Sequence, residues 1–237
     1  MSTRRPYLLR VLVLFVLLSS PTLSAANSLK GWPQGPYNYK VIHDIAVKEE
    51  RPLLVYFYTD WCPYCKRLNN EYIASPEFKK LSSGIYRVQI NPEKSKSGDR
   101  LFKYNYKGTG FPAVFVYVPA VSQEPRQFHP FSKNGDLSSA EYTKKISEQI
   151  ARGYNKRAYE LYKDKKYRQA REYLIKASTY DLKNKYALLL MASIYHKEGY
   201  ENQDKVLLNK ARYIYKKVLK IYPGDKEALS ELRKLGN

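Results

Sequence analysis

Two cysteines, Cys62 and Cys65, lie three positions apart in the segment Trp61-Cys62-Pro63-Tyr64-Cys65, and the chain has no others. The segment follows the apolar run 53–58 and precedes a helix-like stretch, so it is predicted to lie where a strand passes into a helix. The first N–H groups of a helix are unpaired and carry partial positive charge, which favours a thiolate at Cys62. Cys65, nearly one helical turn further on, can attack a mixed disulfide formed at Cys62. The spacing therefore predicts a two-electron switch in which Cys62 attacks and Cys65 resolves.

Three other uses of the cysteine pair are weaker. A closed zinc site needs about four ligands, but the chain has no further cysteine, and its histidines at positions 43, 129 and 196 are scattered. An inert structural disulfide would close almost no loop and would add little stability. A heavy-metal or copper-handling thiol pair is the third alternative. The redox interpretation is favoured, and it implies no metal and no organic cofactor.

Residues 1–26 have the pattern of a secretory signal peptide. Three arginines precede the apolar core 11–18, and small residues at 24–26 offer a cleavage site before Asn27. The apolar core is short for a membrane span, although an uncleaved anchor stays open as an alternative. An exported protein, periplasmic or secreted, is expected. A lone Cys-x-x-Cys pair in that setting is more naturally catalytic than structural.

The chain is basic, with a formal net charge of +20. The surplus is concentrated from Arg152 onward, where 21 basic and 10 acidic residues occur. Weak contact with anionic membrane surfaces or with acidic partners is compatible with this charge, and a solvated lysine-rich surface is the simpler interpretation. Nucleic acid is not an expected partner of an exported chain.

The helices and strands that must position the cysteines are predicted from hydrophobic periodicity and from the residues that cap or end them. Strands are predicted at 53–59, 85–90, 113–118 and 126–130, the first of them apolar on both faces as in a central strand. Helices are predicted at 38–50, at 62–73, from Ser75-Pro76 to Gly84, at 97–106 and from Ser138 to about Ile150. This order, with one βαβ crossover, describes a layered α/β unit.

These residues resemble the thioredoxin superfamily. The resemblance rests on the strand–Trp-Cys-Pro-Tyr-Cys–helix unit and on Gly110-Phe111-Pro112 before a later strand, and it covers about residues 39–150. It implies a thioredoxin-like fold, a central mixed sheet flanked by helices, with Cys62 and Cys65 as the redox-active disulfide. It further implies that Pro112 is a cis proline beside the pair and that Phe111 offers its backbone to a substrate. Trp61, Pro63 and Tyr64 would complete the substrate-binding surface.

One position departs from this pattern. Thioredoxin carries a buried aspartate six residues before its first cysteine, where it assists proton removal from the second, and here that position is Tyr56. We therefore expect a reduction potential between that of thioredoxin, about −270 mV, and that of a strong oxidase, about −120 mV.

The pattern changes at about residue 152. Small and large apolar residues recur there with the spacing of a tetratricopeptide repeat, a helix–turn–helix of about 34 residues. A second copy follows, and its equivalent alanines, Ala170 and Ala211, are 41 apart, so seven extra residues are expected within or beside its turn, between 200 and 210. A capping helix is predicted from Asp225. The resulting division is a signal peptide at 1–26, a thioredoxin-like domain at 27–151 and an all-α repeat module at 152–237.

The sequence thus predicts an exported thiol–disulfide oxidoreductase that acts on protein thiols and disulfides through Cys62 and Cys65. The helical repeats are expected to dock a protein partner, or alternatively to extend the redox domain or form a dimer interface. A different class stays open as well: an adaptor protein in which the cysteine pair is regulatory or vestigial. The physiological substrate, the redox partner, the direction of electron flow and the oligomeric state are left undecided.

Overall fold

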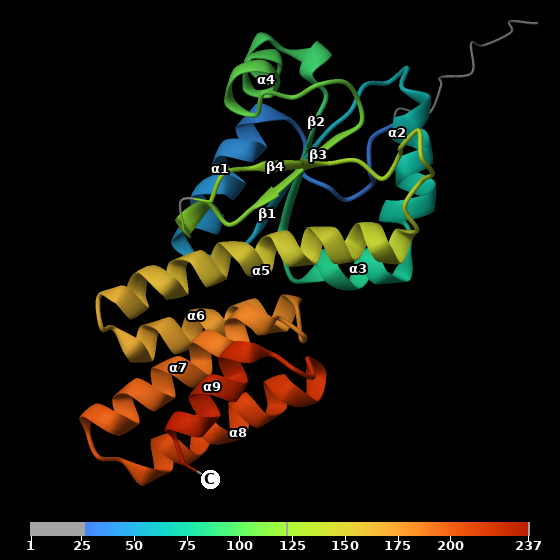
Figure 1. The fold of residues 1–237 in the computed structure, drawn as a ribbon. Coiled ribbons are helices and arrows are strands. Elements are labelled where there is room, and N and C mark those ends of the chain that lie inside the picture. The colour runs from blue at the N-terminus through green and yellow to red at the C-terminus, as the bar shows by residue number, and fades with distance from the viewer. Residues whose placement is uncertain (1–26, 122, 237) are drawn as a thin grey trace, which may run out of the picture.

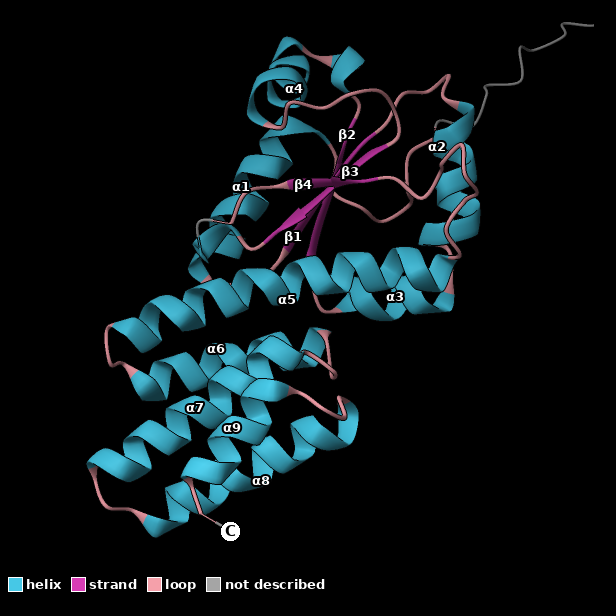
Figure 2. Cartoon of the chain, viewed as in Figure 1, coloured by secondary structure: helices cyan, strands magenta, loops and turns pink. Residues whose placement is uncertain are grey.

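The computed structural model describes residues 27–121 and 123–236, and the expected signal peptide lies outside the described residues. Four strands form one mixed sheet in the order β2-β1-β3-β4 (Figures 1 and 2). β1 (Leu53–Phe57) runs parallel to β2 (Tyr86–Ile90) and antiparallel to β3 (Ala113–Tyr117), and β3 is antiparallel to β4 (Arg126–Phe128). All five β1 residues are buried, which confirms the predicted central strand.

Helices cover both faces of the sheet (Figure 1). α1 (Gly35–Lys48) and α4 (Lys96–Arg100) lie on one side, and α2 (Pro63–Leu68), α3 (Pro76–Ser83) and α5 (Ser139–Lys163) lie on the other. Because side chains alternate along a strand, Leu53, Val55 and Phe57 join the core beneath α1. Leu54 and Tyr56 join the core that contains both cysteines.

Local signals in the sequence fix where several helices begin. Ser75 accepts a hydrogen bond from the Phe78 N–H (3.2 Å), and Pro76 opens α3 as predicted. Ser138 and Glu141 form the predicted capping box of α5. α2 and α4 are shorter than expected, because each continues as a wider π-helical turn, at Asn69–Ile73 and at Leu101–Asn105.

α5 is longer than the sequence predicts. The predicted end near Ile150 is wrong, since the helix continues to Lys163 without interruption. Tyr154, Ala158 and Leu161 prolong its buried face at helical spacing. The first helix of the predicted repeat is therefore fused to the last helix that packs on the sheet. The domain division at 151/152 stays a prediction, with α5 running across it.

An all-α module follows as two helical hairpins and a final helix. α5 pairs with α6 (Tyr167–Tyr180), α7 (Lys185–Glu201) pairs with α8 (Lys205–Ile221), and α9 (Lys226–Lys234) packs on α8 (Figure 1). Asp225 caps α9 as predicted, accepting from the Ala228 N–H at 3.0 Å.

The extra residues of the second hairpin lengthen its helices and leave the turn unchanged. α5 extends five residues past Ala158, whereas α7 extends nine past the equivalent Ala192. α6 begins three residues before Ala170, whereas α8 begins six before Ala211. Each connection still has three residues. Seven residues are two helical turns, so one added turn per helix keeps the facing side chains in register.

The core is continuous between the sheet and the first hairpin. One cluster of buried residues extends from Cys62 and Cys65 through α5 and α6 to Ile194 in α7. A separate, smaller cluster holds α7, α8 and α9 together. Across the described parts of the chain, no helix is long and apolar enough to span a bilayer.

Candidate active site

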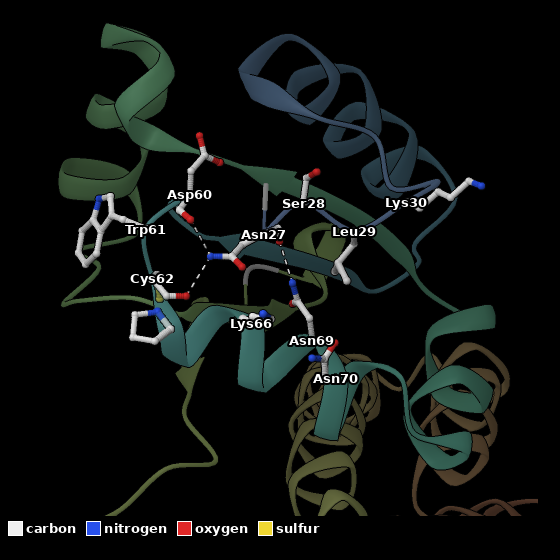
Figure 3. Close-up of a pocket in the computed structure, with 11 residues that line it drawn as sticks. Asn27, Ser28, Leu29, Lys30, Asp60, Trp61, Cys62, Lys66, Asn69 and Asn70 are labelled. Carbon is white, nitrogen blue, oxygen red and sulfur yellow. Dashed lines mark hydrogen bonds between the residues drawn. The ribbon is translucent and has the colours of Figure 1, made fainter. Parts of the chain in front are cut away.

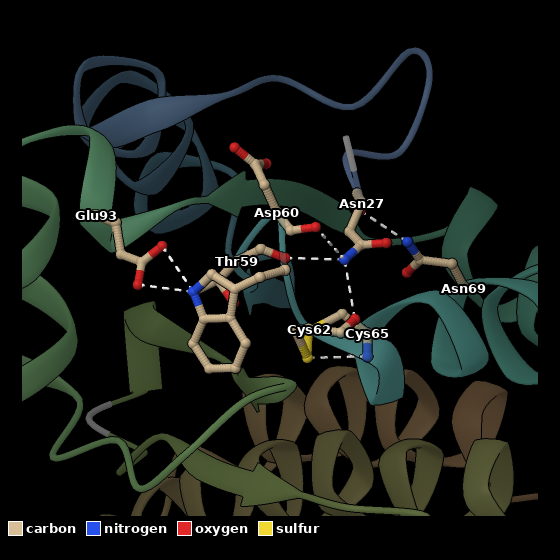
Figure 4. Close-up of a disulfide and its surroundings, with 8 residues drawn as sticks. Asn27, Thr59, Asp60, Cys62, Cys65, Asn69 and Glu93 are labelled. Carbon is tan, nitrogen blue, oxygen red and sulfur yellow. Dashed lines mark hydrogen bonds between the residues drawn. A yellow bond between two sulfur atoms is a disulfide. The ribbon is translucent and has the colours of Figure 1, made fainter. Parts of the chain in front are cut away.

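The cysteine pair lies at the junction of β1 and α2 and forms a disulfide (Figure 4). Cys62 is the N-cap of α2, and the backbone N–H of Cys65 donates to its Sγ at 3.0 Å. Cys62 is 2 % exposed and Cys65 is fully buried. The first turn of the helix thus directs an N–H group at the sulfur that the sequence designates as the nucleophile, and the second sulfur is shielded beneath it.

Aromatic rings flank the disulfide. Trp61 is 68 % exposed, and its indole N–H donates to both carboxylate oxygens of Glu93, at 3.0 and 3.1 Å. The Trp61 ring meets the Phe111 ring edge-on, with centroids 6.4 Å apart. Tyr64 is 54 % exposed, and its ring centroid lies 5.2 Å from that of Phe131. The residues expected to contact substrate therefore include two exposed aromatic side chains, each beside a half-buried phenylalanine.

The Phe111–Pro112 peptide bond is cis, as the family resemblance implies. Phe111 also stacks on Phe102, with centroids 4.8 Å apart, which ties this loop to the core under α1. His129, left without a role by the sequence, lies against the same loop. Burial lowers its pKa, and a hydrogen bond with the Pro112 backbone opposes that shift.

Tyr56 occupies the buried position where thioredoxin has an aspartate. Its side chain is fully buried, and its hydroxyl makes no regular hydrogen bond with any described residue. Burial raises the pKa of Tyr56, and the side chain of Asn69 acts weakly in the opposite direction. The phenol stays neutral, so it is not a base for the Cys65 thiol.

The charges next to α2 are mostly compensated. Arg67 pairs with Glu71 (2.9 Å) and with Asp136 (2.7 Å), and Asp60 pairs with Lys94 (2.7 Å). Lys66 is exposed, and no ion pair of its own appears among the described residues. The positive charge of Arg67 is thus engaged by two carboxylates.

A cleft of about 440 Å³ adjoins Cys62 on its side facing the N-terminal segment (Figure 3). Its walls are residues 27–30, residues 60–63 of the reactive loop 59–63, Lys66 in α2, and Asn69 and Asn70 in the π-helical turn that follows. The N-terminal part of the described chain, residues 27–30, therefore reaches the active site.

Asn27 joins that segment to the reactive loop. Its side-chain nitrogen lies within hydrogen-bond distance of the backbone carbonyls of Thr59 (2.9 Å), Asp60 (3.2 Å) and Cys62 (2.9 Å), so its two N–H groups serve three acceptors and one of them is shared (Figure 4). Asn69 in turn donates to the Asn27 carbonyl at 2.7 Å. Asn27 is itself buried. Sequence analysis missed Asn27 and Asn69, because isolated asparagines carry no periodic or motif signal.

Gln89 fastens the next residues of the segment to the edge of the sheet. This fully buried β2 side chain accepts from the Leu29 N–H (2.7 Å) and donates to the carbonyls of Leu29 (2.7 Å) and Trp32 (3.1 Å). Its own N–H donates to the Pro33 carbonyl at 2.9 Å. The segment is therefore held as an additional partner of the β2 edge.

Metal-ligating side chains do not cluster in the described chain: no group of three or more His, Cys, Asp or Glu residues there could hold a metal ion. The two cysteines themselves are joined to each other. The chemistry that this arrangement of residues directly supports is thiol–disulfide exchange.

Comparison with known proteins agrees with this site. A thioredoxin-like family model matches residues 43–119. The thiol:disulfide interchange protein TxlA of Synechococcus elongatus is 30 % identical over 113 residues, which are 48 % of this chain and 54 % of TxlA. The disulfide bond reductase DsbH of Chlamydia pneumoniae is 26 % identical over 86 residues, which are 32 % of this chain and 51 % of DsbH. The chain thus spans about half the length of these two relatives.

The solved structures to which the chain is similar include a helical-repeat domain. The second tetratricopeptide-repeat domain of human RPAP3, solved with an HSP70 peptide, shares 24 % identity and covers 41 % of this chain and 78 % of that domain, with a TM-score of 0.32. The helical hairpins described above have the order that the repeat spacing predicts. The family match over residues 43–119 and the described fold together give the chain a thioredoxin-like domain, which carries the Cys62–Cys65 pair, and a C-terminal all-α module of helical hairpins.

Proposed function

We propose that this protein is an exported thiol–disulfide oxidoreductase that exchanges disulfides with protein substrates through Cys62 and Cys65. The observation that carries the proposal is the disulfide at the start of α2, with the Cys65 N–H directed at the Cys62 sulfur. The matched family and the printed names of the two relatives support the same reaction class.

The proposed reaction proceeds in two exchange steps. In the reduced protein the Cys62 thiolate attacks one sulfur of a substrate disulfide, which breaks that bond and releases the other substrate sulfur as a thiolate. Cys65 loses its proton to solvent and attacks Cys62, forming the Cys62–Cys65 bond and releasing the second substrate thiolate. Two electrons pass to the substrate, whose thiolates take up two protons. The steps run in reverse when the protein acts as oxidant.

Tyr56 supports an intermediate reduction potential. A neutral phenol gives Cys65 no buried base, so resolution depends on the proton affinity of Cys65 itself. We expect equilibration with glutathione to place the potential between about −270 and about −120 mV.

Substrate contact is assigned to the exposed aromatic surface beside the disulfide. Trp61, Pro63, Tyr64, Phe111 and Pro112 are proposed to bind the segment that carries the substrate sulfur. Trp61 and Tyr64 offer large exposed rings, and these rigid side chains lose little conformational freedom when a substrate binds. The hydrogen bonds from Trp61 to Glu93 fix one of these rings before substrate arrives.

Export is proposed from the signal-peptide pattern at 1–26, with cleavage before Asn27. N-terminal sequencing of the protein recovered from the exported fraction tests this. A mature chain that begins at Asn27 supports the proposal, and a chain recovered only in the cytosol contradicts it.

The helical hairpins are proposed to dock a protein partner. The module is basic and presents exposed aromatic side chains, among them Tyr159 and Tyr186, beside a cleft of about 570 Å³. Cross-linking should recover the same partner from the wild type and from a variant with both cysteines changed to serine. Partner recovery that depends on the cysteines would instead assign the contact to the redox site.

Trapping tests the proposed reaction directly. Cys65→Ser leaves the attacking sulfur without its resolving partner, so a mixed disulfide with substrate should accumulate and disappear on reduction. Cys62→Ser is the matched control and should trap at most a trace. If Cys65→Ser traps nothing and the wild type turns over no model disulfide, the adaptor interpretation replaces the enzyme.

A further inference from the structure

Three backbone carbonyls of the reactive loop converge on one buried side chain. The carbonyl oxygens of Thr59, Asp60 and Cys62 all lie within 3.2 Å of the Asn27 amide nitrogen (Figure 4). These acceptors come from the turn that leads into α2, and the last of them belongs to the attacking cysteine. Thirty-two or more residues separate Asn27 from each acceptor.

We infer that Asn27 is a positioning residue for the exchange reaction: its amide fixes the loop 59–62 and satisfies the carbonyl dipoles beside Cys62. This inference rests on the proposed function, because its consequence is the ease with which Cys62 becomes a thiolate. A carbonyl oxygen carries partial negative charge, so unpaired carbonyls next to a thiolate disfavour it. An amide supplies donors without adding a net charge of its own.

The segment that carries Asn27 is built to hold this side chain in place. Asn69, the first residue of the π-helical turn after α2, donates to the Asn27 carbonyl at 2.7 Å. Gln89 holds Leu29 through hydrogen bonds in both directions, each 2.7 Å long. The side chains of Asn27, Asn69 and Gln89 are amides and do not titrate. Cleavage before Asn27 would add an α-amino group that titrates near about 8, and this group is the same in the wild type and in every variant compared.

Asp60, the charged residue of the loop itself, does not replace Asn27, and the lysines of the cleft, Lys30 and Lys66, have no hydrogen bond to the loop carbonyls from their side chains among the described contacts. The Asp60 side chain is directed away from Asn27 in Figure 4 and pairs with Lys94 at 2.7 Å, so only its carbonyl faces the amide. Without the Asn27 side chain, the Thr59 and Cys62 carbonyls would keep only their longer backbone hydrogen bonds, from the N–H groups of Cys62 (3.4 Å) and Lys66 (3.3 Å). The Asp60 carbonyl would be left to water in the adjoining cleft, or the loop would shift.

The test measures the Cys62 thiol in the full chain, reduced, as the pH dependence of alkylation by iodoacetamide. Asn27→Ala should raise the pKa of Cys62 by about one unit, the order expected when hydrogen bonds of ordinary strength are lost beside a thiolate. Equilibrium with glutathione should then favour the Cys62–Cys65 disulfide about tenfold more, which lowers the potential by about 30 mV. Asn27→Asp, which keeps the shape but replaces the donors with a negative charge, should give a larger shift in both measurements.

Asn70→Ala is the matched control, since Asn70 lines the same cleft but is exposed and makes none of the hydrogen bonds to the loop. In Asn70→Ala, the acid dissociation constant of Cys62 and the equilibrium constant with glutathione should each stay within twofold of the wild-type value. Asn69→Ala should shift both in the same direction as Asn27→Ala, by less, and it serves as the second variant if Asn27→Ala does not fold.

A residue with a merely structural role gives a different result. If the Asn27 and Asn69 variants unfold at lower temperature but keep the wild-type pKa and potential, the inference is overturned. If the wild type itself has an ordinary thiol pKa and no reversible equilibrium with glutathione, the proposed function fails instead. The two failures are distinguished by the wild-type measurement alone.

Discussion

Tyr56 shows how one residue can separate this site from the thioredoxin pattern. Its side chain lies in the same core cluster as Cys62 and Cys65, fully buried, with a neutral hydroxyl that forms no regular hydrogen bond among the described residues. A buried polar group without a partner lowers the free energy of unfolding, so removing the Tyr56 hydroxyl should cost little stability.

We predict that Tyr56→Phe leaves the rate of disulfide exchange and its pH dependence unchanged. The free energy of unfolding should change by less than about 1 kcal/mol, or rise slightly, because no regular hydrogen bond is lost. Stopped-flow exchange with a model disulfide and urea unfolding measure the two quantities. A Tyr56→Phe variant with a shifted pH profile would show that the phenol takes part in proton transfer after all.

Tyr106→Phe is the matched control for that experiment. The Tyr106 hydroxyl contacts the hydroxyls of Tyr117 (2.9 Å) and Tyr39 (3.2 Å) in the core on the opposite face of the sheet. Its removal leaves the hydroxyls of Tyr39 and Tyr117 only their long mutual contact of 3.5 Å, so a loss of about 1–3 kcal/mol is expected with no effect on exchange.

At the scale of elements, the second hairpin depends on a close approach between α7 and α8. A Cβ placed on Gly199 would lie 2.8 Å from the Leu208 Cδ2 and 2.9 Å from its backbone nitrogen. Gly199 lies in the part of α7 that the first hairpin lacks, so the added helical turn packs against its partner only because this residue has no side chain.

Gly199→Ala should lower the free energy of unfolding by about 1–3 kcal/mol, because a backbone atom cannot move aside as a flexible side chain can. Gly84→Ala is the control, since its added Cβ would meet its nearest neighbour at an ordinary 3.6 Å. Thermal unfolding of both variants checks this. If Gly199→Ala and Gly84→Ala are equally stable, α7 and α8 can move apart at little cost, and their close approach does not contribute to stability.

At the scale of the whole molecule, Glu50 links the loop after α1 to the first hairpin. Its carboxylate accepts from Lys176 at 2.7 Å and from the Tyr173 hydroxyl, and its carbonyl accepts from Tyr154 at 2.9 Å. Burial by itself would raise the pKa of Glu50, but the hydrogen bonds from Lys176 and Tyr173 and the nearby positive charges hold it below its ordinary value. The helical module is thus joined to the redox domain by polar contacts as well as by a shared core.

This shift gives the joint a defined pH dependence. Since the folded-state pKa is lowered, the contribution is complete above the ordinary value of 4.5 and is lost as pH falls through the lower folded value. Glu50→Gln should therefore be less stable than the wild type near neutral pH by about 0.5–1 kcal/mol, a modest effect because the pair is partly exposed. The difference should disappear in acid.

Denaturant unfolding at several pH values measures that difference. Glu172→Gln, on the exposed side of α6, is the control and should match the wild type throughout. If Glu50→Gln remains less stable than the wild type by the same amount below pH 4.5, the difference arises from the shape of the side chain and not from its charge.

Much of this architecture could be predicted from local sequence signals. These signals are the two cysteines at a strand–helix junction, the continuous apolar run of β1, the caps at Ser75, Ser138 and Asp225, and the spacing of small residues in the hairpins, and each depends on neighbours a few residues apart. Such patterns are read directly from the chain, because helices and strands have fixed periods.

Other features depended on contacts between distant parts of the chain. The continuation of α5 past Ile150 needs α6 and α7 to cover its apolar face, and the extra residues of the second hairpin could be placed only once both helices were seen. A local pattern indicates that a face is apolar but not which element covers it.

By itself, then, the sequence determined the redox pair, the order of elements around it and the repeat-like helices. Only the tertiary structure decided that Asn27, Asn69 and Gln89 hold the reactive loop and that Glu50 joins the two parts of the molecule. The reason is physical: single side chains that bond to backbone or to other side chains 30 or more residues away follow no period, so they leave no trace until the chain has folded.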